Sequence, residues 1–212
     1  GLVAFPTETV YGLGADAMNT DATNRIYEVK KRPKNHPLIV HVSSIELAKK
    51  LVKSWPKKAD DLANKFWPGP MTLVFKKNNV LPSCVTAGQN TVGIRIPSNK
   101  IALKLLSKFA KNGSGFVAAP SANLYGSLSN TSYKDVKKAI GKYLTDSDLL
   151  LKGDGALFGL ESTIIDFSTD EIAILRPGSI TRESVNKFLK INLQPNISKK
   201  NSPIVSGSLK KH

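Results

Sequence analysis

The chain has 212 residues, a length that fits one globular domain with an appended segment. Its formal net charge is +15, from 31 basic and 16 acidic side chains, which indicates an anionic partner such as nucleic acid, a phosphorylated metabolite or anionic lipid. A single cysteine excludes an internal disulfide framework and a cysteine zinc site, and no apolar run approaches the ~18 residues of a spanning helix. These counts predict a cytoplasmic protein without a membrane segment.

Strand and helix patterns alternate along the chain, beginning with the buried-strand pattern GLVAF, which predicts that the parent protein starts upstream. The expected strands are residues 2–5, 38–42, 71–75, 92–96, 116–120, 148–151, 162–167 and 172–175. The expected helices are residues 21–31, 44–54, 57–67, 99–111, 133–143 and 182–190, with Thr20, Ser98 or Asn99, and Thr181 as capping residues. The interleaved order predicts an α/β fold around one twisted sheet.

The chain divides into a folded part and a tail. Residues 1–190 carry all of the expected strands and helices. From Asn192 the composition shifts to Asn, Pro, Ser and Lys with few apolar residues, which is typical of a linker. We therefore predict one catalytic or binding domain over residues 1–190 and a linker over residues 191–212.

Small and polar residues gather where the expected strands end, the place where open α/β sheets hold their ligands. The loop PTETVYGLGA (6–15) supplies threonine hydroxyls, and Gly12 and Gly14 permit a close approach of backbone. It matches neither the Walker phosphate loop nor the dinucleotide fingerprint. A plain turn is an equally good interpretation of this loop alone.

The stretch KKRPKNHPLIVHV (30–42) combines four basic side chains with two of the three histidines of the chain. It allows three interpretations: a handle for nucleic acid, a pocket for a phosphorylated molecule, or a solvated helix end whose lysines are favoured by the helix dipole. With so few histidines and one distant cysteine, the sequence predicts no protein-bound metal.

Arg95 is the basic residue that the pattern marks most clearly. In NTVGIRIP (90–97) it lies on the strand face opposite Val92 and Ile94, where an arginine is costly unless it is paired or holds an anion. Three further loops add polar groups near strand ends: APSAN (119–123), GLESTI (159–164) and LRPGSIT (175–181). Together they predict a polar site formed by converging loops.

Seven motifs in order carry a resemblance to a known family: FPTETVYGLGADA, KKRPKNHPLIVHV, WPGPMTLVF, NTVGIRIP, AAPSAN, GLESTIIDF and ILRPGSIT. The sequence resembles YrdC-type threonylcarbamoyl-AMP synthases over roughly residues 3 to 190. The resemblance implies an α/β fold with a twisted, largely mixed sheet, flanking helices and a basic concave face. It also implies a reaction that joins L-threonine, bicarbonate and ATP into threonylcarbamoyl-AMP and releases pyrophosphate.

The resemblance implies partners and site residues as well. A separate transferase complex uses the product to modify tRNA, Mg²⁺ accompanies the triphosphate, no metal is permanently bound, and weak tRNA binding is expected. The residues implied for L-threonine are Thr9, His41, Arg95, Ala119 and Ser162. Those implied for ATP are Lys30, Arg32, His36, Thr91, Ser121, Asn123, Ser129 and Arg176, and the reaction is expected to depend most on Lys30, Arg32, His41 and Arg95.

Three positions depart from the family pattern. His36 stands where asparagine is common, Tyr125 replaces a serine, and Asn130 replaces a proline, which we expect to loosen the loop that carries Ser129. The tail SPIVSGSLKKH resembles the linker of longer two-domain members, cut before a tyrosine that touches the nucleotide. We therefore expect weaker ATP retention than in a complete long member.

Two other functions compete with the synthase. The net charge alone favours a tRNA- or double-stranded-RNA-binding module without catalysis, but the chain lacks interleaved aromatic and basic residues, and several lysines (Lys49, Lys50, Lys57, Lys58, Lys137 and Lys138) are expected on outward helix faces. The same domain type occurs in hydrogenase-maturation proteins. Those proteins carry acylphosphatase and zinc-finger segments that this sequence lacks.

Overall fold

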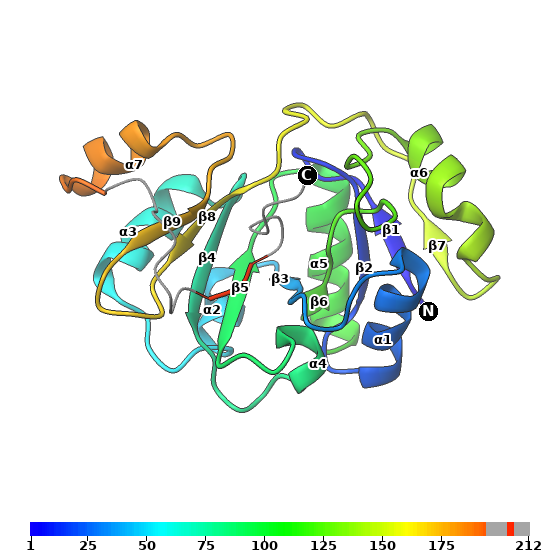
Figure 1. Ribbon diagram of the computed structural model, residues 1–212, viewed down its shortest axis with the longest axis horizontal. Coiled ribbons are helices and arrows are strands. Elements are labelled where there is room, and N and C mark those ends of the chain that lie inside the picture. Colours follow the sequence, from blue (N-terminus) through cyan, green and yellow to red (C-terminus); the bar gives the residue numbers. More distant parts are fainter. Residues whose placement is uncertain (194–202, 206–212) are drawn as a thin grey trace.

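The computed structural model describes residues 1–193 and 203–205. In this part of the chain, nine strands form one mixed sheet in the order β7-β1-β2-β6-β3-β5-β4-β8-β9 (Figure 1). The neighbours β1/β7, β3/β5 and β4/β8 are parallel, and the other pairs are antiparallel. The predicted α/β fold with a mixed sheet and flanking helices is therefore confirmed.

The strands are β1 (Val3–Phe5), β2 (Gly12–Asp16), β3 (Ile39–His41), β4 (Met71–Lys76), β5 (Thr91–Arg95), β6 (Val117–Ala118), β7 (Leu149–Leu150), β8 (Thr163–Asp166) and β9 (Ala173–Arg176). The α-helices are α1 (Thr20–Lys30), α2 (Ile45–Lys49), α3 (Lys57–Phe66), α4 (Ser83–Thr86), α5 (Lys100–Asn112), α6 (Tyr133–Ile140) and α7 (Arg182–Leu189). A single 3₁₀ turn, Gly141–Tyr143, follows α6. Figure 1 shows α3 and α7 beside the β8–β9 end of the sheet, and α1 and α6 beside the β1–β7 end.

Four details differ from the sequence predictions. Strand β2 lies where we expected a loop, since its glycine-rich sequence has a low strand propensity, yet it pairs with both β1 and β6. Helix α1 is capped by Asn19, whose side chain accepts from the Ala22 N–H, and not by Thr20. The helix expected over residues 44–54 ends at Lys49, and the short helix α4 was not foreseen.

One face of the sheet is covered by apolar side chains at both ends and has an open polar part between them. Helix α5 covers the β1–β2–β6 region, where Phe5 and Val117 pack against Ala102 and Leu106. At the other end, Val205 packs on Val74 of β4 and Ile164 of β8. Between these covers, the parallel register of β3 and β5 sets His41 beside Arg95. Polar side chains of the face therefore collect in a gap with apolar cover on both sides.

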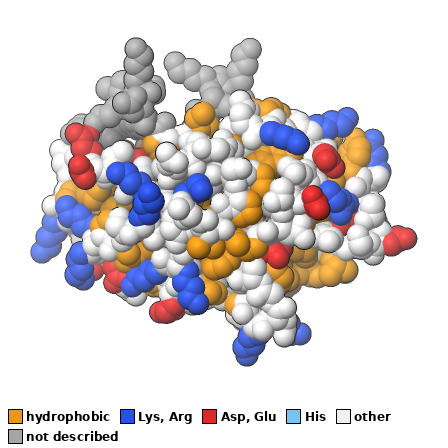
Figure 2. All heavy atoms as spheres, turned by 90° about the horizontal axis from the view of Figure 1, so that it is seen from below, with side chains coloured by type: hydrophobic (Ala, Val, Ile, Leu, Met, Phe, Trp, Pro, Cys, Tyr) orange, Lys and Arg blue, Asp and Glu red, His pale blue; other side chains and the backbone are white. Residues whose placement is uncertain are grey.

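The positive charge of the chain is spread over its surface. The six lysines expected on outward helix faces are all exposed, and some pair with acids, as Lys57 does with Asp61 at 2.6 Å. On the face drawn in Figure 2, Lys and Arg side chains lie in several separate groups, with hydrophobic and acidic side chains between them. Among the described residues, no helix is long and apolar enough to cross a membrane.

Gly178, after β9, approaches the backbone at the start of β8 so closely that a Cβ atom there would lie 2.4 Å from both Glu161 O and Thr163 N. We predict that Gly178→Ala lowers the free energy of unfolding by about 2 kcal/mol, because backbone atoms cannot move aside as a flexible side chain would. Gly141→Ala is the matched control, since its nearest neighbour is Lys137 Cγ at 3.5 Å. Urea denaturation measures both variants, and equal stabilities would contradict the prediction.

Candidate functional site

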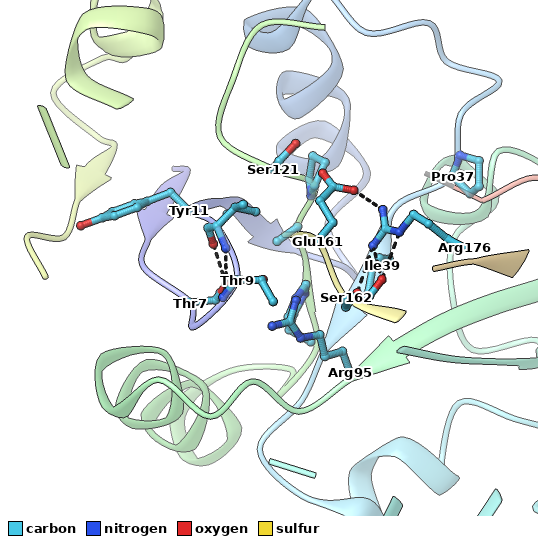
Figure 3. A pocket seen from close by; sticks show the side chains of 15 residues that line it. Thr7, Thr9, Tyr11, Pro37, Ile39, Arg95, Ser121, Glu161, Ser162 and Arg176 are labelled. Atoms are coloured by element: carbon cyan, nitrogen blue, oxygen red, sulfur yellow. Dashed lines mark hydrogen bonds and ion pairs between the residues drawn. The ribbon is translucent and has the colours of Figure 1, made fainter. Parts of the chain in front are cut away.

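One pocket opens in the polar gap of the sheet and collects residues from separate loops and strands (Figure 3). Five of its lining residues are those implied for L-threonine: Thr9, His41, Arg95, Ala119 and Ser162. Two more, Ser121 and Arg176, belong to the set implied for ATP. In Figure 3, Thr7 and Thr9 lie on one side of the pocket, and Ser162, Arg176 and Glu161 on the other.

Arg95 reaches the pocket from the end of β5 and is almost fully buried. Its Nη2 donates to Glu8 Oε1 at 2.6 Å, and its Nε donates to Gly69 O at 3.2 Å. The other carboxylate oxygen of Glu8 accepts from Ser98 N at 3.0 Å. Nη1 has no protein partner among the described residues, so this edge of the guanidinium can hold a carboxylate.

The hydroxyl of Thr9 is fixed as an acceptor toward the pocket. Thr7 Oγ1 donates its only hydrogen to Val10 O at 2.5 Å. The 2.9 Å bond between Thr7 Oγ1 and Thr9 Oγ1 must then use the hydrogen of Thr9. The free lone pair of Thr9 Oγ1 therefore suits an ammonium or hydroxyl donor on a ligand.

His41 is buried beside Arg95, and the edge of its ring meets Phe5 at a centroid distance of 6.0 Å. Burial, aided by the positive charge of Arg95, lowers the pKa of His41 from 6.5 to about 3. The ring is therefore neutral at physiological pH, and His41 Nδ1 has no hydrogen-bond partner among the described residues. A neutral ring with a free nitrogen can orient a ligand but is too weak a base to accept a proton at pH 7.

Arg176, the last residue of β9, holds Glu161 and Ser162, which precede β8. Its Nε and Nη2 donate to Ser162 O at 3.1 and 2.9 Å, its Nη2 also reaches Ser162 Oγ at 3.0 Å, and its Nη1 donates to Glu161 Oε2. The other oxygen of Glu161 accepts from Ser129 Oγ at 3.0 Å. Two residues implied for ATP, Ser129 and Arg176, are thus held by one carboxylate at the pocket wall.

Lys30 lies beneath the pocket and does not line it. The residue is 1% exposed, and its ammonium donates to Ser121 O at 2.6 Å and to Asn123 O. Burial, with the charge of Arg32, lowers the pKa of Lys30 to about 7. This lysine therefore holds the loop of Ser121 and Asn123, and the Oδ1 of Asn123 is a second buried atom without a partner in the described chain.

The remaining implied residues surround the pocket. Arg32 donates to His36 O at 3.4 Å and to Pro37 O at 3.0 Å, while the His36 ring meets Tyr125 edge to face at 5.2 Å. Thr91 lines a second pocket, which shares Pro37 and Ile39 with the first. Val205 closes part of this second pocket, and Gln89 holds the neighbouring Ile204 by two hydrogen bonds to its backbone, 2.9 and 3.1 Å long.

Sequence reasoning missed both acids of the site, Glu8 and Glu161. A signal for each was present, because a buried arginine needs a counter-charge and both acids adjoin a predicted site residue. Among the described residues, no group of three or more His, Cys, Asp or Glu side chains could hold a metal ion. Glu161 is the only carboxylate among the described residues that line the first pocket.

Comparisons with known proteins agree on one family. A family model, Sua5_yciO_yrdC, described as "Telomere recombination", matches residues 1–178. The threonylcarbamoyl-AMP synthase of Pyrococcus abyssi is 42% identical over 195 residues, which cover 92% of this chain and 55% of that protein. That of Bacillus subtilis is 41% identical over 212 residues, which cover 99% of this chain and 59% of that protein.

A solved structure extends the similarity to the fold. The crystal structure of P. abyssi Sua5 complexed with L-threonine has a TM-score of 0.88 and 39% identity, covering all of this chain and 61% of that one. The chain therefore spans little more than half the length of the relatives that it matches.

The low pKa of His41 predicts a pH effect on stability. Between pH 3 and 6.5 the unfolded chain binds a proton at this position that the folded chain does not, so the free energy of unfolding falls as the pH falls through this range. The contribution approaches about 1.4 kcal/mol per pH unit. His41→Gln should therefore lose less stability than the wild type between pH 7 and 4.5 in urea titrations. An unchanged pH dependence would contradict the assignment.

Proposed function

Because the chain belongs to the Sua5/YciO/YrdC family, we propose that it makes threonylcarbamoyl-AMP from L-threonine, bicarbonate and ATP, with release of pyrophosphate. The observation that carries this proposal is the pocket in which Thr9, His41, Arg95, Ser162 and Arg176 converge. Residues 1–190 would form the catalytic domain. Residues 191–212 would form a linker, of which 194–202 and 206–212 lie outside the described residues.

The geometry offers a complementary group for each part of L-threonine. The Nη1 edge of Arg95 suits the carboxylate, because a guanidinium binds carboxylates through paired, charge-assisted hydrogen bonds. The acceptor oxygen of Thr9 suits the amine or the hydroxyl, and His41 Nδ1 offers one more hydrogen-bonding position. All of these groups are buried, which strengthens their hydrogen bonds to a small zwitterion.

The residues implied for ATP fall into two groups: those that would contact the nucleotide and one, Lys30, that would support them. Arg176, Ser121 and Ser129 lie at or beside the pocket, where they can contact phosphates or sugar. Lys30 would support them through the carbonyls of Ser121 and Asn123, to which its ammonium donates, and its direct contact with the triphosphate stays a prediction. Arg32, His36 and Thr91 would complete the surroundings of the nucleotide.

The reaction asks for positioning and charge stabilisation more than for a protein nucleophile. The carbamate of threonine must attack the α-phosphorus while pyrophosphate leaves, and fixed cations such as Arg176 stabilise the charge that develops. Mg²⁺ would enter with the triphosphate, and Glu161 offers the single carboxylate that such a substrate-bound ion commonly uses. The product would pass to a transferase complex that modifies tRNA, in the cytoplasm.

A nucleic-acid-binding module without catalysis is not favoured. The relatives from Pyrococcus abyssi and Bacillus subtilis are named as synthases, and the basic side chains of the face in Figure 2 do not form one continuous stripe. Weak tRNA binding beside the enzymatic activity stays a prediction.

The direct test follows pyrophosphate release from ATP by the purified chain. We expect release that requires both L-threonine and bicarbonate, because the carbamate formed from them is the nucleophile. ATP turnover that ignores threonine would refute the proposed function. Omitting bicarbonate under CO₂-free conditions is the control that distinguishes carbamate formation from direct adenylation of threonine.

Replacement of Arg95 by lysine tests the carboxylate contact while keeping a positive charge next to Glu8. We predict that Arg95→Lys weakens L-threonine binding at least tenfold, because an ammonium cannot reproduce the paired hydrogen bonds of the guanidinium. Arg25→Lys is the matched control, since Arg25 forms a two-bond pair with Asp148 outside the pocket. Titration calorimetry measures both, and wild-type affinity in Arg95→Lys would reject the role.

A further inference from the structure

Glu8 is a buried acid to which the proposed function gives no role. Its side chain is 2% exposed in the loop between β1 and β2, next to Thr9. It does not line the pocket itself, yet it contacts the residue that we assign to the substrate carboxylate. A buried carboxylate needs hydrogen-bond partners that offset the cost of its desolvation. The identity of these partners indicates what the acid does.

Each carboxylate oxygen of Glu8 has its own fixed partner. Oε1 accepts from Arg95 Nη2 at 2.6 Å, and Oε2 accepts from Ser98 N at 3.0 Å, just before the Asn99 cap of α5. The acid is therefore tied to the backbone that leads into α5. Because the Asn99 cap fixes the start of α5, the bond to Ser98 N holds the carboxylate in place beside Arg95.

Arg95 is restrained on two of its three nitrogens. Glu8 holds Nη2, and Gly69 O accepts from Nε at 3.2 Å. An arginine side chain has many rotamers, and loss of either restraint would let the guanidinium turn within the open pocket. With both in place, Nη1 is the nitrogen left for a ligand.

The main chain of Glu8 makes a second connection. Its carbonyl accepts from Leu157 N at 3.0 Å and from Phe158 N at 3.1 Å. These residues lie in the loop that leads to Glu161, the acid on the nucleotide side of the pocket. Glu8 thus joins two parts of the site. Its side chain holds Arg95, and its carbonyl holds the loop that leads to Glu161, the partner of Arg176.

We propose that Glu8 is a positioning residue that orients Arg95 so that its Nη1 edge faces the substrate carboxylate. This inference rests on the proposed function, since it assumes that Arg95 binds L-threonine. Of the two partners of the Glu8 side chain, Arg95 and Ser98 N, only Arg95 lines the pocket. Loss of Glu8 should therefore affect threonine far more than ATP.

The test compares Glu8→Gln with Asp148→Asn. Asp148 is the matched control, because it too holds both an arginine and a backbone amide: Arg25 by two bonds, and Leu2 N at 2.6 Å. Calorimetry with L-threonine and with ATP gives two dissociation constants for each variant. We expect Glu8→Gln to weaken threonine binding at least tenfold and ATP binding less than twofold, while Asp148→Asn changes neither.

A double-mutant cycle with Arg95→Lys separates positioning from general damage. If Glu8 acts through Arg95, then Glu8→Gln added to Arg95→Lys should weaken threonine binding by less than threefold beyond Arg95→Lys alone. Should Glu8→Gln not fold, Glu8→Asp replaces it: the shorter carboxylate keeps the charge but cannot span both partners, so the same selective loss of threonine affinity is expected.

The outcomes distinguish this inference from the proposed function. If the wild-type chain does not bind L-threonine, the proposed function fails. If the wild type binds and the Glu8 variants bind equally well, or lose threonine and ATP alike, the positioning role is overturned while the proposed function stands.

Discussion

The site depends on the need to compensate one buried positive charge. Arg95 projects from a central strand into the sheet face, where an unpaired guanidinium would cost several kcal/mol. Compensation comes from two places in the sequence, Glu8 before β2 and the carbonyl of Gly69 before β4. These loops meet at Arg95 because each supplies an oxygen that accepts a hydrogen bond from its guanidinium. The Ser98 N–H in turn holds the other carboxylate oxygen of Glu8. The pocket lies where Arg95 Nη1 has no hydrogen-bond partner among the described residues.

The same constraint explains why the polar site lies in a gap between apolar covers. Phe5 and Val117 fill the sheet face under α5 so closely that Gly14 has no room for a Cβ atom, which would lie 2.8 Å from Val117 Cγ1. At the other end, Val205 packs on Val74 and Ile164. Apolar walls on both sides lower the local dielectric, which strengthens charge-assisted hydrogen bonds inside the pocket and suppresses ionisation of His41.

Alternation and capping signals predicted most of the elements and the face on which Arg95 lies. They could not predict β2, since its strand pairing is provided by β1 and β6 and not by its own glycine-rich sequence. They also gave no sign of how Lys30 is held: a left-handed turn at Lys31 leads the chain away, and Lys30 donates to the loop of Ser121. Ion-pair partners such as Glu8 and Arg95, 87 positions apart, become evident only when strand order is known.

The three positions that depart from the family pattern make contacts of their own in the structure. His36 and Tyr125 both differ from the residue common in the family, and their rings meet edge to face, so the two changes form one contact. Asn130, which we expected to loosen its loop, donates from Nδ2 to Ala122 O at 2.7 Å, and its own carbonyl accepts from Tyr11 N at 2.9 Å. Those bonds tie the loop of Ser129 to the loop of Ser121 on one side and to the threonine-rich loop on the other. A proline there would have restricted the backbone but could not have supplied the side-chain link, so the substitution exchanges one kind of restraint for another.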